Sequence, residues 1–187
     1  MKVTMKRLYF LLMAALIATS TFAQATEDTT DERFHDTLLN HLVGEWNGAG
    51  LVHGEAFTMK FEASWVMNHQ YLHIHFKSNE DVPWLHMPFE CELFFGYNQT
   101  YKKYIAHEMT VHGDSGPYEG FCYAYQTGNE FKLIKKVSET SDTISIERFT
   151  WEPMLRTWQM NSSVLIKGKQ EEALLDIKLT GAKPSSN

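Results

Sequence analysis

The sequence predicts an all-β fold: a closed, antiparallel, up-and-down barrel of about ten strands, preceded by a short helix. Two observations carry this prediction. Beyond Gly44, apolar and polar residues alternate with a period of two, and turn residues interrupt the alternation at short intervals. Many short alternating strands are typical of a sandwich or a barrel, and an up-and-down barrel leaves no strand edge exposed. We therefore favour the barrel.

The first 25 residues are predicted to be a secretory signal peptide. A basic start is followed by an apolar run over residues 8–17, and Ala23-Gln24-Ala25 supplies small residues where a signal peptidase reads them. The run is short for a membrane span, so none is expected after cleavage. Residues 26–187 are expected to form one exported domain, periplasmic or extracellular, without linkers or repeats.

The charge balance excludes two classes of partner. The formal net charge is −6 and the isoelectric point is about 5.8, and Lys and Arg do not cluster in any block. Nucleic acids and anionic membrane surfaces both select for clustered basic residues. We therefore expect neither as a partner.

A short helix is expected before the barrel. Phe34, Leu38 and Leu42 recur every four residues on one face, the pair at residues 30–31 can cap the helix, and Gly44 ends it.

Strands are expected after the helix, with Pro or Gly at many of the turns. The clearest alternation places Phe57, Met59, Phe61, Ala63 and Trp65 on one face. The ten expected strands cover residues 45–52, 57–67, 71–77, 89–97, 101–109, 118–125, 131–137, 144–151, 154–160 and 172–179.

The entry into the first strand carries a family resemblance. Leu42-Val43-Gly44-Glu45-Trp46-Asn47-Gly48 fits an L-x-G-x-W-x-G pattern, Trp65 lies on the second strand, and Gly96-Tyr97 with Tyr104 fits a hairpin. Over roughly residues 36–180 the chain resembles secreted bacterial lipocalin-like (calycin) barrels, a family classed as a domain of unknown function. The resemblance implies a lipocalin-like fold and no particular activity.

The same entry is similar to that of nitrobindin-type haem barrels. Their proximal haem ligand is a late His, and this sequence has no His after His112. The identity of any cofactor is left open.

Two polar residues fall on strand faces that are expected to point inward. His107 shares its face with Ile105 and Met109, and Arg156 shares its face with Trp158. A buried Arg needs an anionic partner. By analogy with fatty-acid-binding barrels, that partner is the anionic group of an amphiphile; the alternatives are an internal pair with Glu147 or a position at the rim. The candidate ligand-binding residues are Trp65, Tyr97, His107, Tyr125, Arg156 and Trp158.

The candidate metal ligands are His73 and His75. Two His residues spaced two apart share one face of a strand and can chelate one metal ion. However, Leu72, Ile74 and Phe76 form the better core face, which would leave both His side chains on the outer surface.

The two cysteines lie on different expected strands with one strand between them. A disulfide needs Cα atoms within about 7 Å, so buried free thiols at Cys91 and Cys122 are at least as well supported as a bridge.

We favour a protein that binds a small hydrophobic or amphiphilic molecule inside the barrel. The alternatives are an enzyme acting in the same cavity, a metal- or haem-linked scavenging protein, and an interaction module with a filled barrel. Nucleophile-elbow, P-loop, Rossmann and zinc-protease motifs are missing from the sequence. No catalytic residue is therefore assigned.

Overall fold

The computed structural model describes residues 33–83, 85–111, 120–136, 142–167 and 169–183. These residues belong to a compact unit spanning Arg33–Asn187. The expected signal peptide lies outside the described residues. No helix among the described residues has the length and apolar character needed to cross a membrane.

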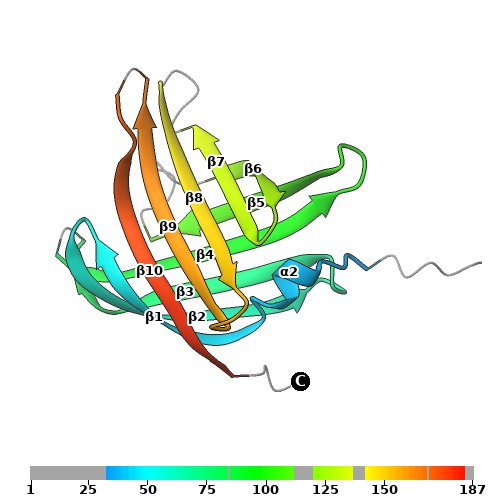
Figure 1. Cartoon of the computed structure of the whole chain (residues 1–187), viewed down its shortest axis with the longest axis horizontal. Coiled ribbons are helices and arrows are strands. Elements are labelled where there is room, and N and C mark those ends of the chain that lie inside the picture. The colour runs from blue at the N-terminus through cyan, green and yellow to red at the C-terminus, as the bar shows by residue number, and fades with distance from the viewer. Residues whose placement is uncertain (1–32, 84, 112–119, 137–141, 168, 184–187) are drawn as a thin grey trace, which may run out of the picture. The chain divides into compact units, whose positions relative to one another are not determined.

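The described chain forms a closed barrel of ten strands in the order β1-β10-β9-β8-β7-β6-β5-β4-β3-β2. Every strand pairs antiparallel with its neighbour along the chain, and β10 pairs with β1 to close the barrel (Figure 1). The all-β, ten-stranded antiparallel barrel is therefore confirmed. Its strands are β1 Gly44–Val52, β2 Glu55–Val66, β3 Tyr71–Val82, β4 Met87–Asn98, β5 Lys103–Thr110, β6 Gly120–Thr127, β7 Glu130–Lys136, β8 Thr143–Glu152, β9 Thr157–Ile166 and β10 Glu172–Lys183.

The helix before the barrel is a single turn, α2, at Thr37–Asn40. Asp36 caps it, and the Asp36 carboxylate accepts a hydrogen bond from the Leu39 N–H at 2.8 Å. The helix is thus shorter than expected, and the expected cap at residues 30–31 lies outside the described residues. Four residues cannot sustain a helix alone, so packing against the barrel holds α2 in place.

The segment Arg33–Val43 closes one end of the barrel, which we call the base. The indole N–H groups of Trp46, Trp65 and Trp158 donate to three residues of this segment, at 2.8, 2.8 and 3.1 Å respectively. The Tyr104 hydroxyl adds a hydrogen bond to Asp36 at 2.5 Å. Indole rings bury a large apolar area while their N–H groups satisfy loop carbonyls. The base is therefore sealed by aromatic side chains.

Several expected strand boundaries are wrong. β3 continues to Val82 and β4 begins at Met87, so most of the stretch between the expected strands 71–77 and 89–97 belongs to a longer hairpin. β9 begins at Thr157, and residues 153–156 form the turn before it. Met154 is 96% exposed because it lies in this turn.

The inward face of β5 is also opposite to the expected one. Ala106 and Glu108 are buried and pair with Phe95 and Leu93 of β4, which are themselves buried. Residues directly opposite each other in an antiparallel pair point to the same side of the sheet. Glu108 therefore points inward, and a one-residue difference in phase reverses every side chain of the strand.

Candidate functional site

Three charged side chains lie inside the barrel, far from the base. Glu108 on β5, Lys135 on β7 and Glu147 on β8 have side chains that are 7%, 3% and 8% exposed. The Lys135 ammonium lies 2.8 Å from Glu147 Oε1 and donates a further hydrogen bond to Glu108 Oε2. Lys135 thus joins the two carboxylates. We call these three residues the inner triad.

The strand period places each member of the inner triad. On β7, Phe131, Leu133 and Lys135 alternate on the buried face, and Glu147 stands opposite Leu133 on β8. Each charged residue therefore occupies a position at which the rest of its strand carries mostly apolar side chains. Ser145, also on the buried face of β8, has a hydroxyl without a hydrogen-bond partner among the described residues.

Burial and charge shift the protonation of the triad. Burial, followed by repulsion from Glu147, raises the pKa of Glu108 to about 8, although Lys135 acts in the opposite direction. For Lys135, burial favours the neutral form, but Glu147 and Glu108 outweigh it and raise the pKa. At neutral pH the ammonium is therefore charged, and Glu108 exchanges a proton near physiological pH.

Both cysteines flank the triad as free, buried thiols. Burial raises the pKa of Cys91 well above its usual value, and Cys91 hydrogen-bonds to Glu108. Burial also raises the pKa of Cys122, to about 12. Neither thiol ionises at neutral pH, so neither is an activated nucleophile. The structure settles the open disulfide question in favour of free thiols.

A cavity of about 120 Å³ opens beside the triad. The two carboxylates of Glu108 and Glu147 form part of its wall, together with Ser162. The apolar part of its wall comes from strand ends remote from the base, which contribute Val52, Phe57, Phe89, Leu174 and Leu175, and from the interior of β3 and β9, which contribute Phe76 and Met160. We call this end of the barrel the mouth. An apolar cavity of about 150 Å³ is known to hold a benzene-sized molecule, so this space suits a small ligand or one end of a longer ligand.

Three of the six candidate ligand-binding residues lie at the base. Trp65 stacks on His69 with ring centres 4.1 Å apart, and Tyr97 stacks on Phe34 at 5.7 Å. Trp158 is fully buried against the segment that closes the base. All three side chains pack the closed end and do not line the cavity at the mouth.

The other three candidates do not face the interior. Tyr125 is exposed, and His107 lies on the outer face of β5, where it stacks on Phe121 with ring centres 4.1 Å apart. Arg156 is exposed in the β8–β9 turn with φ of 51°. The expected inward positions of His107 and Arg156 are wrong, because the pairing of β5 and the start of β9 differ from the sequence-based boundaries.

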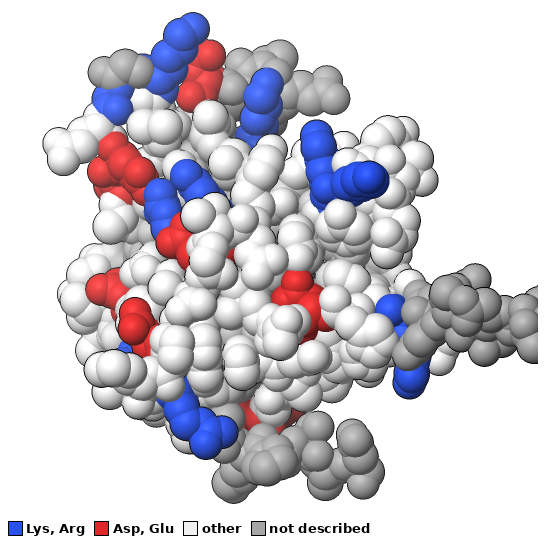
Figure 2. Space-filling view, turned by 45° about the vertical axis from the view of Figure 1, so that its right-hand side comes forward, with Lys and Arg blue, Asp and Glu red and all other residues white. Residues whose placement is uncertain are grey.

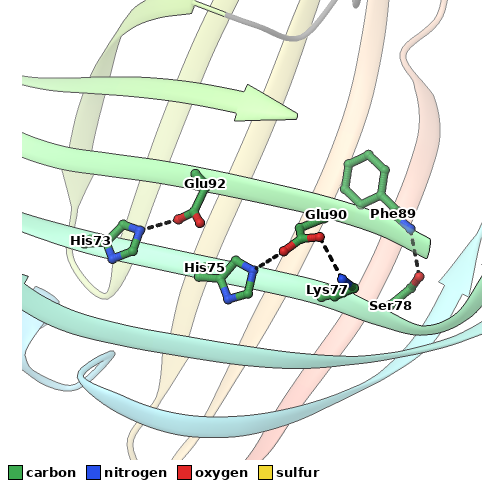
Figure 3. Close-up of polar contacts among 7 residues, drawn as sticks. All are labelled: His73, His75, Lys77, Ser78, Phe89, Glu90 and Glu92. Carbon is green, nitrogen blue, oxygen red and sulfur yellow. Dashed lines mark hydrogen bonds and ion pairs between the residues drawn. The ribbon is translucent and has the colours of Figure 1, made fainter. Parts of the chain in front are cut away.

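The His73–His75 motif lies on the outer surface, as the core face of β3 indicated. The His73 ring hydrogen-bonds to Glu92, and His75 Nε2 lies 2.8 Å from Glu90 Oε1 (Figure 3). Lys77 also contacts Glu90 at 2.8 Å, and hydrogen bonding from Lys77 and His75 lowers the pKa of Glu90. Among the described residues, no three or more His, Cys, Asp or Glu side chains lie close enough together to hold a metal ion.

The outer surface also carries ordinary exposed charges. Figure 2 shows acidic and basic side chains scattered over one face of the barrel among other residues. Exposed pairs of this kind contribute little to stability.

No family model matches the chain, and no curated protein matches its sequence. The inner triad and its cavity are therefore the features from which we infer a function. The sequence does not reveal the triad, because the pattern of β5 predicts the opposite inward face and because Lys residues occur on both faces of the Lys132–Lys136 stretch.

Proposed function

We propose that this protein is an exported, lipocalin-like binding protein that holds a small amphiphilic molecule in the mouth of its barrel. One observation carries the proposal: two buried carboxylates, those of Glu108 and Glu147, line a largely apolar cavity. Small-molecule sites are typically concave and apolar with a few convergent polar groups. The signal-peptide pattern and the Gly44-Glu45-Trp46 entry support the export and the fold family.

The energetics of the triad favour a binding role over a structural one. Replacing a buried ion pair with apolar residues of similar volume is often neutral or stabilising. The triad is thus not needed merely to fill the barrel, and its carboxylates lie at the cavity rather than in the packed base.

Native mass spectrometry of the mature protein, purified from its cells without denaturant, tests the proposal. We expect a co-purified small molecule that is lost when Ser162→Phe fills the cavity. Tyr125→Phe, a change on the exposed outer face, is the matched control and should retain the molecule. A wild-type protein that carries nothing and binds none of a panel of small amphiphiles would contradict the proposal.

The same cavity supports a second candidate, an enzyme acting on a small molecule. Glu108 has a pKa of about 8 and reaches the cavity wall, which suits a general acid or base at neutral pH. His107 lies on the outer face of β5 and does not reach this cavity, so Glu108 is the candidate acid–base group. Turnover of a bound molecule that stops in Glu108→Gln would favour the enzyme over the carrier.

A further inference from the structure

We infer that the ligand of this cavity carries a single positive charge, as an amine does, and places that charge against Glu108 and Glu147. The inference rests on the binding function proposed above and specifies the chemical class of the ligand. Three independent features of the interior support it: the charge balance of the triad, the position of its carboxylates, and the wall of the cavity.

The triad holds one more acid than base. Two carboxylates face one ammonium, so full ionisation leaves one negative charge inside the barrel. Among the described residues, the other titratable groups facing the triad are the thiols of Cys91 on β4 and Cys122 on β6, which stay neutral. A buried uncompensated charge is costly, so Glu108 holds a proton below about pH 8 in the absence of ligand. A monocationic ligand would take the place of that proton.

The carboxylates lie between the cavity and the ammonium. Glu108 and Glu147 line the cavity, whereas Lys135 contacts them from the barrel interior and is not part of the lining. An entering ligand therefore meets the two acids before the ammonium. A fatty acid or another anion would add negative charge beside two acids that share one ammonium, which reverses the ligand charge that an inward Arg156 would have favoured.

The wall of the cavity limits the size and the chemistry of the uncharged part of the ligand. Phe57, Phe76 and Phe89 contribute aromatic rings, and His53 is the remaining titratable group among the described residues that line the cavity. Aromatic faces attract organic cations as well as apolar groups. A cavity of about 120 Å³ accommodates a ring or a short alkyl chain, and any longer tail would extend out of the mouth.

Binding of a cation should release a proton. Without ligand, Glu108 is largely protonated below its pKa of about 8. A cation beside Glu108 favours the carboxylate and lowers this pKa. Between the lowered pKa and about 8, affinity should thus rise roughly tenfold per pH unit, with release of about one proton per ligand.

Calorimetric titration of the mature protein with three matched probes tests the inference. The probes are benzylammonium, benzyl alcohol and benzoate, which share a ring and differ in charge. We expect benzylammonium to bind most tightly, with an affinity that rises between about pH 6 and about pH 8 and proton release visible in buffers of different ionisation enthalpy. Tighter binding of benzoate, or equal binding of benzyl alcohol, would overturn the inference while leaving the binding function standing. Failure of all three probes to bind would count against both this inference and the proposed binding function.

Glu108→Gln supplies the matched variant. Glutamine resembles the protonated carboxyl, so the variant should fold like the wild type. It should bind benzylammonium at least tenfold more weakly, without pH dependence, and bind benzyl alcohol unchanged. Glu92→Gln makes the same change on the outer face and should alter neither affinity. Unchanged benzylammonium binding in Glu108→Gln would refute the assignment of the charge to this site.

Discussion

At the scale of single residues, the phase of a side chain along its strand decides its chemistry. Glu90 and Glu92 on β4 point outward, pair with His and Lys side chains, and remain partly exposed to water. Glu108, on the neighbouring strand, points inward, where burial and Glu147 raise its pKa to about 8. The same carboxyl group is thus an ordinary surface charge in one position and a proton-exchanging group in the other.

Lys135 should be the residue of the triad least tolerant of loss. Lys135→Met removes the only ammonium in contact with the two buried carboxylates within the described residues. Breaking a buried pair in this way costs about 3–5 kcal/mol. Urea unfolding at neutral pH should show this loss in the free energy of unfolding, with partial recovery in acid as the carboxylates become protonated. Lys136→Met, at the exposed neighbouring position, should change that free energy by less than about 0.5 kcal/mol; a similar loss in both variants would contradict the argument.

At the scale of secondary-structure elements, the two ends of the barrel have different roles. The Arg33–Val43 segment and the Trp side chains seal the base, and the mouth keeps a cavity beside the triad. The close passage of β1 and β10 contributes to closure: a side chain at Gly50 would place its Cβ 1.9 Å from the Asp176 carbonyl oxygen. Glycine is therefore required where these two strands meet.

Trp158→Phe separates the structural role of the base from binding. The variant loses the hydrogen bond from the indole to the His41 carbonyl and part of a fully buried ring. We expect the free energy of unfolding to fall by about 1–3 kcal/mol, with benzylammonium affinity at the mouth unchanged. Tyr125→Leu, at an exposed position, is the control and should leave both quantities unchanged. If Trp158→Phe greatly weakened benzylammonium binding without lowering the free energy of unfolding, Trp158 would belong to the ligand site.

At the scale of the whole molecule, the triad links global stability to pH. The folded-state pKa of Glu108, about 8, lies above the ordinary value of 4.5 that applies to an unfolded chain. Between these values the folded state binds more protons than the unfolded state, so rising pH costs stability. The loss of stability caused by ionisation of Glu108 is absent below about pH 4.5 and complete above about pH 8.

Denaturant unfolding measured between about pH 5 and about pH 8 checks this linkage. The contribution of Glu108 should lower the free energy of unfolding by up to about 1.4 kcal/mol per pH unit as pH rises. Glu108→Gln should remove this slope, and Glu92→Gln should retain it. Equal slopes in the wild type and Glu108→Gln would show that Glu108 does not carry the linkage.

The barrel architecture and its clearest strands follow from the amino-acid sequence alone. Period-two alternation and turn residues predict ten antiparallel strands because a strand with one buried face must alternate. The outward position of His73 and His75 followed from the same rule, since Leu72, Ile74 and Phe76 form the stronger apolar face. The local alternation of apolar and polar residues was sufficient to predict which side chains point inward wherever one face of a strand was clearly more apolar than the other.

The residues that form the interior site become evident only once the strands are paired. β5 carries apolar residues on both faces, so its pattern does not distinguish Ile105 and Met109 from Ala106 and Glu108; pairing with Leu93 and Phe95 does. Lys135 and Glu147 face the interior for the same reason, because their register across β7 and β8 is a long-range property. Charged residues become a site only when closure of the barrel brings them together and removes them from water.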